Sequence, residues 1–363
     1  MGIKCGIVGL PNVGKSTLFN ALTAAEIPAE NYPFCTIDPN VGIVNVPDPR
    51  LAALAEIAKP KKIVPTIVEF VDIAGLVEGA SKGEGLGNQF LAHIRETDAI
   101  VHLVRCFESD DITHVAGRVD PIDDIETIET ELLLADLEIT TKSLQKAERT
   151  AKAGEKEAIR RHKLLERLVA ELEAGRPVRG LALEEGDLQH MRELQLITAK
   201  PVMFLANVAE DAIDSNPIAE SVVAYAKACG AEAVVISAAI EAELALLDET
   251  EQAEFLSDLG LTEPGLNRVI HSAYRLLDLK TFFTAGPTEV RAWTVKREAM
   301  APAAAGAIHT DFEHGFIRAE VIGYDDYIAL GGEHGAREAG KLRLEGKTYV
   351  VAEGDVCHFR FNV

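Results

Sequence analysis

The sequence predicts an α/β fold with a doubly wound, mostly parallel sheet, interrupted by a helical hairpin and followed by a small α+β domain. Residues 9–16, Gly-Leu-Pro-Asn-Val-Gly-Lys-Ser, fit G-x-x-x-x-G-K-[ST] between a strand-like run and a helix-like run. Residues 125–199 lack strand alternation and have apolar residues at helical spacing. Further apolar or β-branched runs predict buried strands at 64–71, 99–104, 201–206 and 234–239.

The motif at residues 9–16 predicts a phosphate-binding loop. Its glycines let backbone N–H groups turn toward phosphate oxygens, and the helix N-terminus that follows favours negative charge. Lys15 can reach the β- and γ-phosphates, while the hydroxyl of Ser16 can ligate Mg²⁺. We therefore expect the nucleotide phosphates to contact the end of this loop, at Asn12, Val13, Gly14, Lys15, Ser16 and Thr17.

Two later segments are candidates for switches that sense the γ-phosphate. The turn-rich stretch 31–36 ends in Thr36, which can meet Mg²⁺ and the γ-phosphate. The predicted strand 64–71 delivers D-x-x-G, in which Asp72 can hold Mg²⁺ through water and the Gly75 amide can approach the γ-phosphate. Leu76 then stands where many related hydrolases have a glutamine that orients the attacking water.

Base recognition is expected after the strand at 201–206, which ends in Asn207-Val208-Ala209-Glu210. A guanine site would have N-K-x-D here, and both the lysine and the aspartate are replaced. An asparagine amide can pair with adenine N6 and N7, which favours ATP. In the alternative, Glu210 replaces the aspartate and accepts from guanine. The next strand runs into a loop with Ser237 and Ala238 that closes over the base.

The helical stretch 125–199 carries leucine stripes and one row of cations at helical spacing. On the simpler interpretation the row is a solvated face with ion pairs, because glutamates are interspersed with it. On the functional interpretation it contacts a phosphate backbone. The candidate RNA or ribosome contacts are Lys142, Lys146, Arg149 and Arg160.

The tail has short alternating strands at 281–284, 290–295 and 349–351 among glycine-bearing turns, which predicts a separate α+β domain. We place the nucleotide-binding domain at 1–124 and 200–279, the hairpin at 125–199 and the tail domain at 280–363. Within the tail, His309, Asp311 and His314 lack a convincing ligand spacing for a metal, so a hydrogen-bonded turn is expected there.

Composition restricts the class of protein without identifying a partner. The chain has 363 residues, 47% of them hydrophobic, and a net charge of −22, which argues against a protein that coats DNA or RNA with its whole surface. Its apolar runs are too short for a membrane span and its first residues lack a signal-peptide core, so a cytoplasmic protein is expected. Five scattered cysteines without a C-x-x-C motif indicate reduced thiols.

Together these motifs resemble the YchF family, the Obg-like ATPases within the translation-factor-related GTPase class, from residue 1 to residue 363. The resemblance rests on the stretches quoted above, the glycine-rich segment 79–90 and the segment 309–319, His-Thr-Asp-Phe-Glu-His-Gly-Phe-Ile-Arg-Ala. It implies a P-loop domain interrupted by a coiled-coil arm, a C-terminal ubiquitin-like TGS domain, ATP preferred over GTP, and binding to the ribosome or its large subunit and ribosomal RNA. No membrane or DNA partner is expected.

The resemblance also assigns roles to two residues. Spacing alone makes His114 a surface-loop histidine, whereas its match to the family's histidine makes it the group that orients water. Asn12 matches the asparagine that some relatives use for a monovalent cation, which implies K⁺ stimulation. The expected function is a Mg²⁺-dependent ATPase that acts as a slow conformational switch. Two alternatives stay open: a GTP-hydrolysing Obg-type switch, and a nucleotide-gated binding module with incidental hydrolysis.

Overall fold

The computed structural model describes residues 3–24, 40–73, 86–109, 114, 117–152, 154–184 and 186–362. The chain divides into two compact units, the first formed by Met1–Val44 and Glu69–Val269 and the second by Asn45–Val68 and Ile270–Val363. The predicted switch residues Thr36 and Gly75 lie outside the described residues. In the described part of the chain, no helix is both long and apolar enough to cross a membrane.

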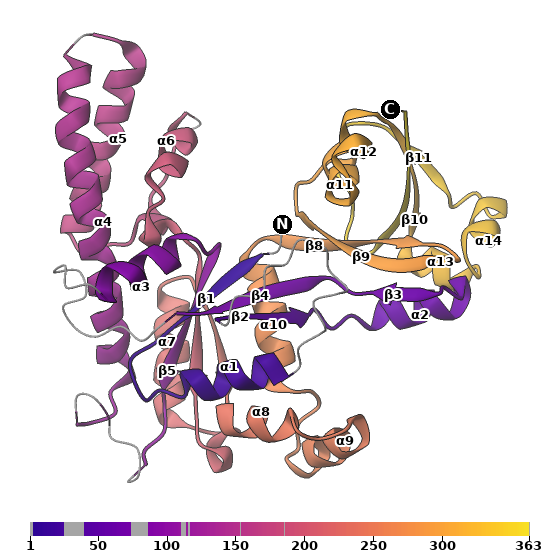
Figure 1. The fold of residues 1–363 in the computed structure, drawn as a ribbon, viewed down its shortest axis with the longest axis horizontal. Helices are drawn as coiled ribbons and strands as arrows, with labels where there is room; N and C mark the ends of the chain where they lie inside the picture. Colours follow the sequence, from indigo (N-terminus) through magenta and orange to yellow (C-terminus); the bar gives the residue numbers. More distant parts are fainter. Residues whose placement is uncertain are drawn as a thin grey trace. The chain divides into compact units, whose positions relative to one another are not determined.

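The first unit contains a sheet with the strand order β2-β4-β1-β5-β6-β7 (Figure 1). Its strands are β1 (Lys4–Val8), β2 (Val41–Asn45), β4 (Ile67–Asp72), β5 (Ala99–Arg105), β6 (Val202–Asn207) and β7 (Glu232–Ile236). The pairs β1–β4, β1–β5, β5–β6 and β6–β7 are all parallel. Every residue of β5 and β6 is buried, as expected for central strands covered on both faces. The predicted mostly parallel sheet is confirmed.

Helices follow these strands along the chain, as the fold class requires. They are α1 (Lys15–Ala24), α3 (Leu86–Arg95), α7 (Pro217–Ala228), α8 (Ala238–Leu244), α9 (Glu249–Asp258) and α10 (Gly265–Leu276). The predicted strand at 234–239 is wrong at its end, because Ser237 caps α8 by accepting a hydrogen bond from the Ile240 amide. That cap ends the strand at Ile236 and starts a helix.

The predicted helical hairpin is present in the first unit. It consists of α4 (Pro121–Ala151) and α5 (Lys156–Glu173), which lie side by side in Figure 1, and α6 (Asp187–Leu194) follows them. The pair shares an apolar core that includes Leu144, Leu164, Leu168 and Leu172. Helix α4 begins before residue 125, because the Asp120 side chain accepts from the Asp123 amide and Pro121 occupies the first turn.

The second unit contains a sheet with the order β11-β10-β12-β8-β9-β3. Its strands are β3 (Lys62–Val64), β8 (Leu279–Ala285), β9 (Glu289–Lys296), β10 (Phe316–Gly323), β11 (Arg343–Glu345) and β12 (Asp355–Phe361). Its helices are α2 (Pro49–Ala58), α11 (Ala301–Ile308), α12 (Thr310–His314), α13 (Tyr324–Ala329) and α14 (Glu333–Glu338). The strand expected at 349–351 is wrong, since only an isolated bridge joins Val350 to Met300 there.

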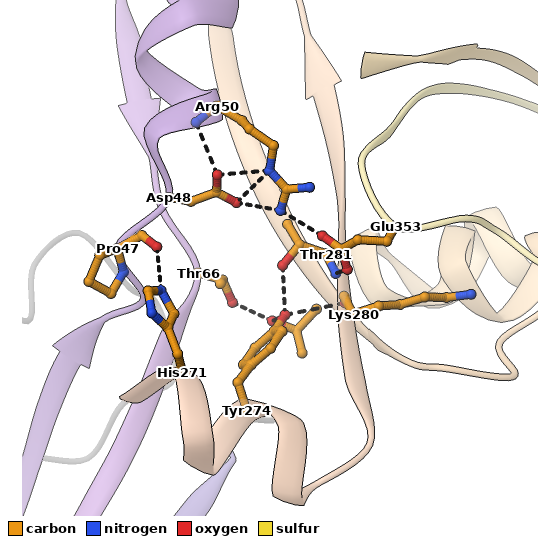
Figure 2. A network of polar contacts seen from close by, with 10 residues as sticks. Pro47, Asp48, Arg50, Thr66, His271, Tyr274, Lys280, Thr281 and Glu353 are labelled. Atoms are coloured by element: carbon orange, nitrogen blue, oxygen red, sulfur yellow. Dashed lines mark hydrogen bonds and ion pairs between the residues drawn. The ribbon is translucent and has the colours of Figure 1, made fainter. Parts of the chain in front are cut away.

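Residues 45–68 were expected in the nucleotide-binding domain, but they belong to the second unit. Leu51 and Leu54 of α2 share a core with Phe283 and Val290, and β3 pairs with β9. Figure 2 shows polar contacts that join this segment to the rest of the second unit: Arg50 donates to Glu353, and Pro47 O accepts from His271. The Thr66 hydroxyl also bonds to that of Thr294. The contacts of Arg50 with Glu353 and of Pro47 with His271 join residues more than 200 positions apart, so the local sequence pattern cannot predict them.

Candidate functional site

The loop between β1 and α1 has the geometry expected of a phosphate cradle. Asn12 and Gly14 have positive φ angles of 64° and 94°, so the backbone turns sharply before the helix begins at Lys15. A Cβ atom on Gly14 would lie 2.4 Å from Asn207 Nδ2, so only glycine fits this position. The loop therefore delivers the N-terminus of α1, with its unpaired N–H groups, next to the side chains that follow.

Lys15 and Asp72 meet at the carboxyl end of the sheet. Lys15 Nζ donates to Asp72 Oδ1 at 2.5 Å, and both side chains are mostly buried. The register of β1 and β4, with Ile7 opposite Asp72, brings the D-x-x-G strand beside the phosphate loop. The structure thus joins two motifs that are far apart in the sequence.

Ser16 and Asp72 offer oxygen atoms of the kind that Mg²⁺ prefers. Ser16 is exposed in the first turn of α1, next to Lys15, and Asp72 is held by Lys15. A hydroxyl and a carboxylate beside the lysine of the phosphate-loop motif are the kinds of oxygen ligand that fit a magnesium ion. In the described residues, no group of three or more His, Cys, Asp or Glu side chains is placed to hold a metal ion by itself.

Asn207 links the base-recognition segment to the phosphate loop. Its Nδ2 donates to Val13 O at 2.9 Å and its Oδ1 accepts from the Ala238 amide at 2.9 Å, with the residue 3% exposed. These two bonds hold the loop against the start of α8. They use one amide hydrogen and one acceptor site, so the base contact expected of Asn207 stays a prediction.

The other predicted base-site residues surround this link. Val208 is buried and its amide donates to Ile236 O, while Ser237 is fully buried at the start of α8. Glu210 is exposed in a short 3-10 helix, Glu210–Ala212. The structure therefore brings Asn207, Ser237 and Ala238 together and leaves the carboxylate of Glu210 toward solvent.

His114 is buried, which makes its interpretation as a surface-loop histidine wrong. It is 6% exposed, and its Nε2 lies 3.0 Å from Oδ2 of Asp124, which is 4% exposed in the first turn of α4. Burial raises the pKa of Asp124 above its ordinary value, and the hydrogen bond with His114 opposes that shift. A buried histidine held by a carboxylate is better suited to a fixed role than a solvated histidine.

Asp124 and Arg105 are site residues that the sequence analysis missed. Arg105 is 1% exposed at the end of β5, and its guanidinium donates to Phe107 O at 3.0 Å and to Asn12 O of the phosphate loop at 3.5 Å. The available signal was an arginine at the end of a strand that is apolar apart from His102. The sequence contains no comparable signal for Asp124, because acidic residues are common in the first turn of a helix.

The predicted cation row on the hairpin divides into paired and exposed members. Arg160 lies 3.5 Å from Asp187 and 3.6 Å from Glu184, and Lys142 pairs with Glu138 one turn away. Lys146 and Arg149 are exposed, and within the described residues no ion pair involves them. The solvated-face interpretation therefore holds for Lys142 and Arg160, while Lys146 and Arg149 are the better candidates for an external anion.

The segment at 309–314 forms a hydrogen-bonded turn, as expected. The Asp311 amide donates to His309 Nδ1 at 3.2 Å, so His309 caps α12. His309 and Asp311 side chains are more than half exposed.

Comparison with known proteins gives two family matches. Residues 4–142 match the family described as 50S ribosome-binding GTPase. Residues 279–362 match YchF-GTPase_C, described as a protein of unknown function (DUF933). The two matches fall on the P-loop part of the chain and on its C-terminal part.

Full-length relatives are also similar. The chain is 61% identical to the ribosome-binding ATPase YchF of Haemophilus influenzae over 363 residues, and 54% identical to that of Bacillus subtilis over 366 residues, with 100% of both chains covered in each case. A solved structure described as the Schizosaccharomyces pombe YchF GTPase superposes with a TM-score of 0.88 at 38% identity, covering 99% of this chain and 98% of that one.

Proposed function

This chain belongs to the YchF family, and from that premise we propose that it is a Mg²⁺-dependent ATPase that acts as a slow conformational switch and binds the ribosome or its RNA. The observation that carries the proposal is the junction of Lys15, Ser16 and Asp72 at the carboxyl end of the sheet, beside the N-terminus of α1. A ligand that needs a lysine, a helix N-terminus and magnesium-binding oxygens together is a nucleoside triphosphate.

In this proposal the side chains act mainly by position and charge. Lys15 leaves Asp72 to bind the β- and γ-phosphates, and Asp72, Ser16 and Thr36 hold the metal ion. A Mg²⁺ ion held by these residues would supply positive charge that offsets the negative charge developing during phosphoryl transfer. Gly75 senses the γ-phosphate through its amide, and His114 orients the attacking water where Leu76 replaces the usual glutamine.

ATP is the proposed nucleotide because the sequence Asn207-Val208-Ala209-Glu210 lacks the lysine and aspartate of a guanine site. The relatives' names include both activities, ribosome-binding ATPase and YchF GTPase. A GTP-driven switch, with Glu210 as the guanine acceptor, is therefore the second candidate. Asn12, with its left-handed backbone, is the residue through which K⁺ would act.

The proposed ribosome contact lies on the hairpin. Between residues 142 and 163 the chain has eight Lys or Arg residues and three Glu residues, although the whole chain has a net charge of −22. Such a local excess of cations supports binding to phosphate groups of ribosomal RNA. If the hairpin engages RNA only in one nucleotide state, the protein is a gated binding module in which hydrolysis resets binding.

Lys15→Ala tests the phosphate site directly. Loss of its ammonium should weaken Mg-ATP binding by about 10-fold or more, in line with about 1.5–3 kcal/mol for a hydrogen bond to a charged group. Calorimetric titration measures the affinity, and phosphate release measures turnover. Lys227→Ala is the control, since Lys227 is an exposed lysine in the last turn of α7. Parental affinity in Lys15→Ala would contradict the site.

A further inference from the structure

Asp124 contacts His114 but has no role in the function proposed above. We propose that Asp124 is the positioning residue for His114: it fixes the imidazole for the hydrolytic step without touching the nucleotide itself. This inference rests on the proposed function, in which His114 orients the attacking water. Its structural basis is a 3.0 Å contact between two side chains that are both less than a tenth exposed.

Asp124 is attached to a rigid element. The Asp120 side chain accepts from the Asp123 amide, Pro121 starts α4, and the Asp124 amide donates to Asp120 O at 3.0 Å. Helix α4 also packs against β5 of the sheet. The carboxylate is therefore held by the helix and by the sheet together, whereas His114 belongs to the connection between β5 and α4. A group on a helix can fix the position of a loop side chain more accurately than loop contacts do.

The contact with Asp124 also affects the orientation and the tautomer of the His114 ring. With Asp124 ionised, its oxygen can only accept, so this proposal makes His114 Nε2–H the donor and gives the ring one orientation. A carboxylate behind a catalytic imidazole has this same orienting effect in other hydrolases, where its loss lowers turnover while the fold stays intact.

Electrostatics connect this pair to the phosphate loop. Burial lowers the pKa of Arg105, and the negative charge of Asp124 opposes that shift. The Arg105 guanidinium in turn donates to the carbonyl oxygen of Asn12. The charge of Asp124 thus acts on the Arg105 guanidinium as well as on the imidazole that it contacts.

Asp124→Asn is the informative variant because it keeps the shape of the side chain and removes its charge. We expect the kcat for ATP hydrolysis to fall by at least about 10-fold, with the Kd for Mg-ATP changed by less than about two-fold, since orientation affects only the reacting state. Asp123→Asn is the matched control: it removes the same charge from the same helical turn, but its side chain is 57% exposed and points to Arg118.

A double-mutant cycle separates positioning from a general structural effect. If Asp124 acts through His114, Asp124→Asn lowers kcat in the parental protein and causes no further loss in a His114→Ala background. Asp124→Glu, which keeps the carboxylate, should retain more turnover than Asp124→Asn. In the unmutated protein, ¹⁵N shifts of the His114 ring should report the Nε2-protonated tautomer, a readout that does not depend on any variant folding.

The outcomes distinguish the inference from the proposed function. Parental turnover in His114→Ala overturns the role of His114 and this inference with it. Slow turnover in His114→Ala combined with parental turnover in Asp124→Asn overturns the inference alone. Losses that add in the double variant, or an Nδ1-protonated ring in the unmutated protein, also overturn it.

Discussion

His102 is a buried histidine whose lowered pKa predicts that the first unit loses stability in acid. It lies on β5, 3% exposed, and burial lowers its pKa to about 3, with the positive charge of Arg179 adding to the effect. In the unfolded chain the ordinary pKa of about 6.5 returns. Because the folded-state value is lower, the unfolded chain binds a proton first as the pH falls, and stability is lost below about pH 6.5.

We therefore predict that the free energy of unfolding drops by about 2 kcal/mol between pH 7 and pH 5 on account of His102. His102→Gln should reduce this pH dependence, whatever it does to stability at pH 7. Urea unfolding at both pH values, followed by far-ultraviolet circular dichroism, measures the difference. His93→Gln serves as control, because His93 is exposed on α3. An unchanged pH dependence in His102→Gln would contradict the assignment.

Individual site residues differ in how far the sequence predicted them. Lys15, Ser16 and Asp72 were predicted because short motifs encode the local backbone that their chemistry requires, and the structure brings Lys15 and Asp72 together. For Asn207, the sequence predicted its place in the site but not its bonds to Val13 and Ala238, which depend on the packing of distant segments. Asp124 was missed for the same reason, since its partner His114 is recognised only in three dimensions.

At the scale of elements, periodicity predicted the parallel sheet and the hairpin, because buried strands and paired helices have strong patterns. It failed for residues 45–68, whose helix α2 and strand β3 are packed by partners more than 200 residues away. Periodicity also failed at Ser237, where a helix cap starts α8. Short apolar segments do not contain the information that selects their packing partner.

The hairpin gives an element-scale prediction about the ribosome. Lys146→Glu should weaken co-sedimentation with ribosomes several-fold and reduce the salt dependence of binding by about one counterion, if Lys146 contacts a phosphate. Lys227→Glu makes the same charge change on an exposed face of α7 and should have little effect. Sedimentation across a range of salt concentrations measures both quantities.

Equal losses in Lys146→Glu and Lys227→Glu would point to an effect of overall charge. No loss in either variant would remove the hairpin from the proposed interface. Such a result would leave the nucleotide site untouched, because the two claims rest on different residues.

The whole molecule consists of two compact units, and in the proposed function the bound nucleotide selects between states of the protein. The P-loop unit supplies the phosphate site and the hairpin, and the second unit matches the C-terminal family module over residues 279–362. A nucleotide can bias such a protein between two states only through a difference in its affinity for them. The proposed switch therefore depends on which nucleotide, ATP or GTP, the protein binds more tightly.

Competition between ATP and GTP for the full chain, with Mg²⁺ present and followed by calorimetry, tests that claim most directly. Asn207-Val208-Ala209-Glu210 lacks the guanine-binding pair, so we predict that ATP binds at least about 10-fold more tightly, a difference of about 1.4 kcal/mol. Equal or tighter binding of GTP would contradict the account and make Glu210 the guanine acceptor of a GTP-driven switch.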